Sequence, residues 1–123
     1  MSRSPSRIAP CPRRPTCVST EAVPGPRRME PIPFRGDPAF ALERLARLLE
    51  ATPRTRVRHR EEGYLHAEVR SRVFGFVDDV DLEVDAEARL VRFRSASRLG
   101  RWDLGVNRRR MGRLRRAFLA AEG

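Results

Sequence analysis

The stretch YLHAEVRSRVFGFVDDVDLEVDAEARLVRFRSAS, residues 64–97, decides the fold, because apolar and polar side chains alternate along most of it. A period of two is typical of β-strands that bury one face against a core. The link EEG just before this stretch predicts a hairpin with one more strand. The alternation and the hairpin together predict four strands in an antiparallel meander: 55–60, 64–71, 73–84 and 89–97.

Helical patterns flank these strands on both sides. Asp37 can cap a helix that has Pro38 at its first position, and the helix must end by Thr52 because Pro53 follows. A second helix begins after Asn107, its expected cap. Its apolar residues recur at helical spacing: Met111, Leu114, Phe118 and Ala121. We therefore predict an α+β fold with two helices packed on one face of the four-stranded sheet.

The N-terminal part of the chain is rich in proline, and eight of the ten prolines fall within residues 5–33. Such a segment is not regular helix. We predict a Pro/Arg-rich extended arm over 1–30, disordered over 1–8, followed by a single α+β domain over 31–121. Within EPIPF (30–34) a short edge strand is expected, where proline is tolerated.

The charge of the chain is unevenly distributed. The net charge is +10, and all 26 basic residues are arginine. Residues 78–87 carry only carboxylates among their charged groups, whereas residues 89–116 carry arginines and one acid, Asp103. If these segments are neighbours in the fold, much of the basic surface is neutralised. With few aromatic residues available for base stacking, no specific nucleic-acid partner is expected.

The two cysteines, Cys11 and Cys17, are too far apart for a CxxC redox motif. No apolar stretch is long enough to cross a membrane, and no secretory h-region is present, so we expect a cytoplasmic protein. In a reducing compartment the cysteines are expected as free thiols, with a disulfide as the alternative. His59 and His66 match no zinc-binding spacing, so no metal ion or cofactor is expected.

Strand alternation places Asp78 on the apolar face of its strand, where an unpaired carboxylate is costly. Two interpretations remain open. Asp78 forms a structural ion pair with the following Arg-rich segment, or it acts as a general acid or base. The alternate acids of the strand are expected on a solvated face, where a cation site is the less favoured interpretation: Asp79, Asp81, Glu83 and Asp85.

The segment RSASRLGRWDLGVNRRR, residues 94–110, places consecutive arginines in the first turn of the second helix. The helix dipole favours negative charge there, so this arrangement suits a docked anion. The anion is either internal or an external phosphate or carboxylate. The candidate ligand-binding residues are Arg94, Ser95, Ser97, Arg98, Asp103, Asn107, Arg108 and Arg110.

Four motifs together resemble those of one protein family in order and spacing: CPRRPTCVST, PIPF, YLHAEVRSRVFGFVDDVDLEV and RSASRLGRWDLGVNRRR. The chain resembles the family catalogued as domain of unknown function 1499 (DUF1499) over roughly residues 9–119. The resemblance implies one domain, and it implies no established activity, cofactor or substrate.

We expect a small soluble domain that acts as a non-catalytic binding or accessory module. The arginine cluster would hold an anionic small molecule or an acidic protein surface. The alternative is an enzyme that uses Asp78 as general acid or base beside those arginines, and a weaker alternative is a non-specific nucleic-acid binder. The sequence leaves the oligomeric state open.

Overall fold

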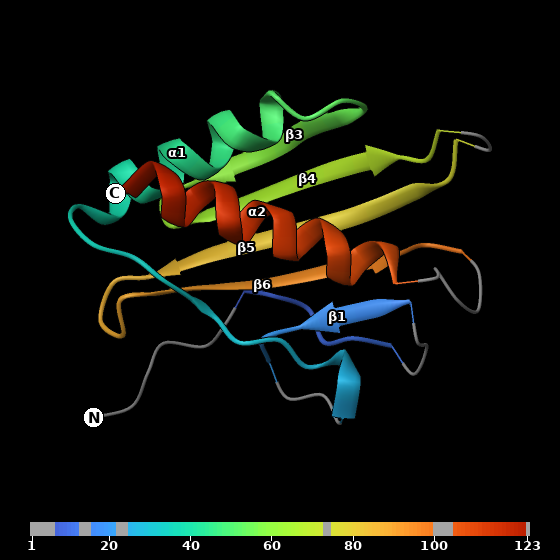
Figure 1. Cartoon of the computed structure of the whole chain (residues 1–123), viewed down its shortest axis with the longest axis horizontal. Coiled ribbons are helices and arrows are strands. Elements are labelled where there is room, and N and C mark those ends of the chain that lie inside the picture. Colours follow the sequence, from blue (N-terminus) through green and yellow to red (C-terminus); the bar gives the residue numbers. More distant parts are fainter. Residues whose placement is uncertain (1–6, 13–15, 22–24, 73–74, 100–104, 123) are drawn as a thin grey trace.

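The alternating stretch forms the centre of one antiparallel sheet (Figure 1). This arrangement comes from a computed structural model, which describes residues 7–12, 16–21, 25–72, 75–99 and 105–122. The elements in this part of the chain are β1 (Cys17–Ser19), the 3-10 turn η1 (Gly25–Arg27), β2 (Ile32–Pro33), α1 (Pro38–Glu50), β3 (Thr55–Glu61), β4 (Tyr64–Arg70), β5 (Val77–Asp85), β6 (Leu90–Ser97) and α2 (Val106–Glu122).

The sheet has six strands, so the prediction of four is wrong. The order is β1-β6-β5-β4-β3, and β2 also pairs with β6. Both additional strands run antiparallel to β6. With three and two residues, neither is long enough to show an alternating pattern. The edge strand expected within EPIPF is confirmed as β2, and it ends at Pro33.

Strands β3 to β6 follow the predicted meander, and the largest shift of a boundary is at the start of β5. β5 begins at Val77 rather than at residue 73. The predicted strand over 73–84 would place Phe76 on the same apolar face as Asp78, but Phe76 lies before β5 and is 49% exposed, so this prediction is wrong. Phe74 lies outside the described residues. From Asp78 onward the alternation holds, because Val80 and Leu82 are both fully buried.

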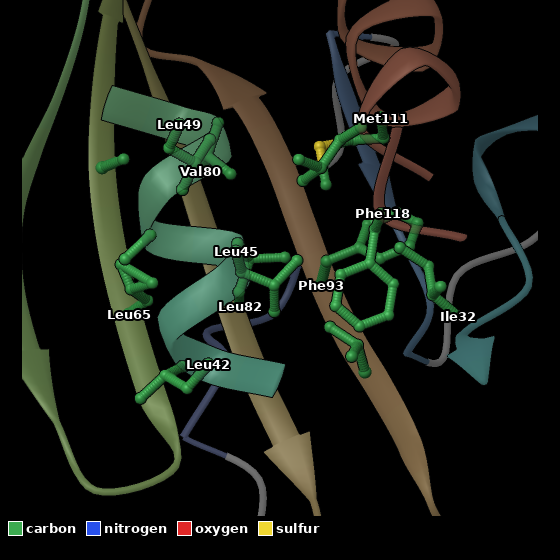
Figure 2. Packing of buried hydrophobic residues seen from close by; sticks show 14 of the residues in the cluster. Ile32, Leu42, Leu45, Leu49, Leu65, Val80, Leu82, Phe93, Met111 and Phe118 are labelled. Atoms are coloured by element: carbon green, nitrogen blue, oxygen red, sulfur yellow. The ribbon is translucent and has the colours of Figure 1, made fainter. Parts of the chain in front are cut away.

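Both helices cover the same face of the sheet (Figure 1). Asp37 caps α1 as expected, since its Oδ1 accepts a hydrogen bond of 2.8 Å from the backbone of Ala39. The core lies between helices and sheet (Figure 2), and its largest fully buried apolar side chains are Ile32, Leu45, Leu65, Leu82, Phe93, Met111 and Phe118. Neither helix in the described part of the chain is long and apolar enough to cross a membrane.

The N-terminal segment packs against the opposite face of the sheet. Arg7 donates from its backbone N–H to Glu83 over 3.0 Å, and Ile8 is only 6% exposed. Arg94 donates to the Pro10 carbonyl over 3.2 Å. The expectation of disorder through residue 8 is therefore wrong for its last two residues, and residues 1–6 lie outside the described part.

This packing also corrects the expected exposure of the acidic residues on β5. Asp81 and Glu83 are only 4% and 9% exposed, because arginines and the N-terminal segment cover them. Asp79 and Asp85 are half-buried. The face opposite the helices is thus a layer of ion pairs rather than a solvated acidic surface.

The two cysteines form a disulfide, so the expectation of free thiols is wrong. Cys11 and Cys17 have Cα atoms 5.7 Å apart. The disulfide joins the N-terminal segment to β1. The expectation of free thiols was based on a reducing compartment, whereas disulfides persist mainly in oxidising compartments.

Candidate functional site

The carboxylate of Asp78 pairs with Arg110 beneath α2. Arg110 Nη2 donates to Asp78 Oδ2 over 2.8 Å, and the two side chains are only 15% and 12% exposed. The register of the sheet places Asp78 on the helix-facing side, opposite Ser97. Asp78 thus finds its partner in the Arg-rich segment, as its place on an apolar face requires.

Asn107 extends this pair into a buried hydrogen-bond network. Its Oδ1 accepts from Arg110 and from Ser95, each over 2.7 Å. Its Nδ2 donates to the Thr16 carbonyl over 3.0 Å and to Ser97 Oγ over 3.1 Å. The side chain has no exposed surface. Asn107 lies inside α2, which begins one residue earlier, so the expected capping role is wrong.

The remaining arginines of the predicted cluster lie elsewhere. Arg94 of β6 and Arg98, which directly follows β6, lie on the face opposite the helices, where Arg94 Nη2 lies 3.0 Å from Asp81 and Arg98 Nε lies 2.9 Å from Asp79. Neighbouring residues of a strand point to opposite faces. The sheet therefore separates Arg94 and Arg98 from Ser95, and the eight predicted residues do not form one site.

Arg108 has a different role from its neighbour Arg110. Its guanidinium donates to the carbonyl oxygens of Pro26 and Arg28, the latter over 2.9 Å. Arg108 therefore fixes the turn that follows β1. Asp103, the other candidate internal anion, lies outside the described residues.

The ion-pair layer neutralises much of the basic surface, as the sequence suggested for neighbouring acidic and basic segments. On the adjacent strands β5 and β6, Asp81 lies opposite Arg94 and Glu83 opposite Arg92. Burial acts to raise the pKa of Asp81, but hydrogen bonds from Tyr64 and His66, with the Arg94 charge, outweigh it and lower this pKa below its ordinary value.

Three residues of this layer have spacing suited to a metal ion. Ligand atoms of His66, Glu68 and Asp79 lie within 4.8 Å of one another. Both carboxylates already accept hydrogen bonds from Arg98, and Glu68 also accepts one from Arg58. The bonds from Arg58 and Arg98 lower the pKa of Glu68. Because arginine occupies these oxygens, the cluster is better described as part of the ion-pair layer.

A cleft of about 530 Å³ opens beside Asp78, where the end of α1 meets the start of α2. This is the right-hand end of the sheet in Figure 1. We call it the arginine cleft, and it is lined by Leu48, Leu49, Thr52, Pro53, Arg54, Thr55, Val69, Arg70, Ser71, Arg72, Asp78, Val106, Arg110, Met111, Arg113, Leu114 and Ala117.

The charges of the arginine cleft are strongly unbalanced. Five arginines line it, and Asp78, its single acidic residue, is already paired with Arg110. Arg70 contacts the Gly75 carbonyl over 3.4 Å. In the described part of the chain, Arg54, Arg72 and Arg113 have no carboxylate within ion-pair distance. The cleft therefore offers an excess of guanidinium groups to an anion.

Of the residues predicted for ligand binding, Arg110 is the one that lines this cleft; Asp78, the candidate acid or base, lines it too. The sequence analysis missed Arg54, Arg72 and Arg113. They come from three separate segments with no shared motif. The one available signal was the spacing of Arg113 three residues after Arg110, which places both on one side of α2.

Comparison with known proteins gives one match. Neither the curated proteins nor the solved structures contain a similar chain. The family described as "Protein of unknown function (DUF1499)" matches residues 7–118, which include all six strands, α1 and most of α2. The match covers nearly the whole chain, and the chain therefore belongs to the DUF1499 family.

Proposed function

We propose that this domain is a binding module that holds an anionic small molecule in the arginine cleft. The observation that carries the proposal is the unbalanced charge of the cleft. Arg54, Arg72 and Arg113 converge there with no carboxylate partner among the described residues. A concave site lined with one sign of charge concentrates ligands of the opposite sign.

The geometry of the cleft supports this role. Its volume of about 530 Å³ lies within the range of small-molecule sites. Guanidinium groups bind phosphate and carboxylate through paired hydrogen bonds. The Asp78 carboxylate pairs with Arg110 and so neutralises one of the five arginines, and the buried Asn107 fixes the position of Arg110.

The proposal places the anion differently from the sequence analysis. The arginines of β6 face away from the cleft, and carboxylates neutralise them. An enzymatic role has less support, because the Asp78 carboxylate is paired with Arg110 and the Ser95 hydroxyl donates a hydrogen bond to Asn107. Among the described residues, no histidine is hydrogen-bonded to either serine of the network.

Binding of inorganic phosphate at low ionic strength tests the proposal. We expect phosphate to raise the melting temperature in a concentration-dependent way, beyond sodium chloride of equal ionic strength. A ligand at a hundred times its Kd stabilises the folded state by about 2.7 kcal/mol. Arg72→Ala and Arg113→Ala should each weaken phosphate binding roughly tenfold, the scale of one lost charge-assisted hydrogen bond.

The matched control is Arg116→Ala. Arg116 is exposed on α2 one turn after Arg113, and it does not line the cleft. Arg116→Ala removes the same charge as Arg113→Ala from the same helix. Because Arg116 lies outside the cleft, the phosphate affinity of this variant should stay near that of the wild type. Equal losses in Arg113→Ala and Arg116→Ala would show that phosphate responds only to net charge, and this outcome contradicts the proposal.

A further inference from the structure

The floor of the arginine cleft is apolar. Leu49, Met111 and Leu114 are 4%, 0% and 8% exposed, and they form the deep part of the cleft together with Val69. The half-buried Leu48 and the more exposed Val106 and Ala117 continue this surface toward the mouth. These three residues form the apolar walls of the cleft: Leu48 from α1, and Val106 and Ala117 from α2.

The arginines lie around this apolar surface rather than within it. Arg54, Arg70, Arg72 and Arg113 are all exposed, whereas the buried lining residues are apolar except for Asp78. The cleft therefore has a charged rim and an apolar floor. Its two parts come from different residues, so they can be changed independently.

A small hydrated anion would use only the rim. Inorganic phosphate can reach the guanidinium groups, but it buries none of the apolar floor. A ligand that also carries a hydrocarbon chain can lay that chain on the partly exposed apolar surface of Leu48, Val106 and Ala117 above the buried floor, and each methylene group removed from water tightens binding about fourfold. The cleft is thus complementary to a molecule with one charged end and one apolar end.

We propose that the ligand of the arginine cleft is an anionic amphiphile, with a phosphate or carboxylate head group on the arginine rim and a hydrocarbon chain on the apolar floor. This inference rests on the proposed function and names the class of ligand for the same site. The occupant is a single amphiphile molecule taken up into the cleft. The cleft volume of about 530 Å³ suits a chain of moderate length.

A chain-length series on the wild-type protein tests the inference directly. Calorimetric titration with inorganic phosphate, butyl phosphate, hexyl phosphate and octyl phosphate, each below its micelle concentration, gives four values of Kd. We expect affinity to rise about fourfold per methylene until the floor is covered. Octanoate should also bind more tightly than inorganic phosphate, as octyl phosphate does, because both molecules carry one anionic head group and a hydrocarbon chain.

The outcomes separate this inference from the proposed function. If all four phosphates bind with equal Kd, the site holds an anion and the amphiphile inference is overturned. If inorganic phosphate and octyl phosphate both fail to bind, the proposed function falls as well. A steady gain with chain length supports both.

A bulky substitution on the apolar wall of the cleft provides the second readout. Ala117 lines the cleft from α2, and it is exposed, so Ala117→Trp can occupy the cleft without entering the core. This variant should lose the gain in affinity from the longer chains. Ala120→Trp is the matched control, because Ala120 is exposed on the same helix and lies outside the cleft. It should keep the full chain-length dependence.

Vesicles distinguish uptake into the cleft from adsorption to a charged surface. Vesicles of phosphatidylglycerol and phosphatidylcholine can attract any exposed arginines. Cosedimentation that is equal in wild type and Ala117→Trp, with no chain-length dependence in solution, would overturn the inference in favour of surface adsorption. Binding of octyl phosphate that Ala117→Trp abolishes supports it.

Discussion

Arg110 Nη2 lies 2.8 Å from Asp78 Oδ2, and this ion pair joins the first turns of α2 to the start of β5. One side of the pair faces the arginine cleft, and the other faces the buried amide of Asn107. The pair therefore has two roles. It secures the helix on the sheet, and it sets the position of one guanidinium at the proposed site.

Replacing Asp78 tests the structural role. Asp78→Ala leaves Arg110 partly buried without its counter-charge, and breaking one side of such a pair costs about 3–5 kcal/mol. Asp78→Asn keeps a hydrogen-bond acceptor of the same shape and should cost less. Urea denaturation at neutral pH measures both free energies of unfolding. If Asp78→Ala leaves the free energy of unfolding unchanged, the carboxylate is well solvated and Arg110 is held by its hydrogen bonds to Asn107 and Ser95.

Replacing Asn107 should be at least as harmful, although the residue carries no charge. Its amide bonds to Ser95, Ser97, Arg110 and the Thr16 carbonyl at once. Each buried polar group left without a partner costs about 1–3 kcal/mol. Asn107→Ala should therefore lower the free energy of unfolding by more than the cost of one unpartnered polar group. Urea denaturation measures this loss.

Asn107→Asp provides the comparison. It keeps the acceptor oxygen but places a second oxygen, in place of the donor, against the Thr16 carbonyl. We expect a destabilisation close to that of Asn107→Ala. Wild-type stability in Asn107→Asp would show that donation to Thr16 contributes nothing.

The central strands and both helices could be predicted from the sequence because each carries a long periodic pattern. The short strands β1 and β2 could be predicted less completely, because strands of three and two residues are too short to show a periodic pattern. Their pairing with β6 is a tertiary effect. It accompanies the burial of Cys17 and Ile32, which are both 0% exposed.

The site was predicted less completely than the fold. Strand alternation correctly gave Asp78 a buried position. The same alternation in β6 places Arg94 and Ser95 on opposite faces, so these two residues cannot share one site. The arginine cleft forms where the last residues of α1, the last residues of β4 and the first turns of α2 meet in space. No local pattern encodes that meeting, so Arg54 and Arg72 could be found only from the structure.

The lowered pKa of Asp81 predicts an acid-sensitive contribution to stability. A carboxylate with a folded pKa below its ordinary value of 3.8 stabilises the fold above that value, and the contribution is lost as pH falls through the folded pKa. Between pH 7 and pH 3 the wild type should therefore lose more free energy of unfolding than Asp81→Asn. Glu87→Gln, which removes an exposed carboxylate from the turn after β5, should lose as much as the wild type.

The disulfide predicts a redox-dependent stability. Cys11 and Cys17 are six residues apart, and a loop of this size gives a stabilisation of about 2 kcal/mol in the chain-entropy account. Cys11→Ser should cost about this much, because Cys11 is only half-buried and its replacement disturbs no core packing. A phosphine reductant should destabilise the wild type equally and leave Cys11→Ser unchanged. An unchanged wild type in reductant would show that the disulfide contributes no stability.

Arg54 combines an unfavourable backbone with a place in the arginine cleft, so stability and binding should respond to it in opposite directions. Its φ of 56° lies in the left-handed region, which costs a residue with a side chain about 1 kcal/mol relative to glycine. Arg54→Gly relieves this cost, although glycine also gains freedom in the unfolded chain. Arg54→Ala removes the same guanidinium and keeps the strained backbone.

We therefore expect Arg54→Gly to be more stable than Arg54→Ala, by up to about 1 kcal/mol in urea denaturation. Both variants should bind inorganic phosphate roughly tenfold more weakly than the wild type, because each loses one charge-assisted contact. Equal stability of the two variants would show that the backbone at this turn relaxes without cost. Wild-type phosphate affinity in both would remove Arg54 from the anion site and leave Arg70, Arg72 and Arg113 to form its rim.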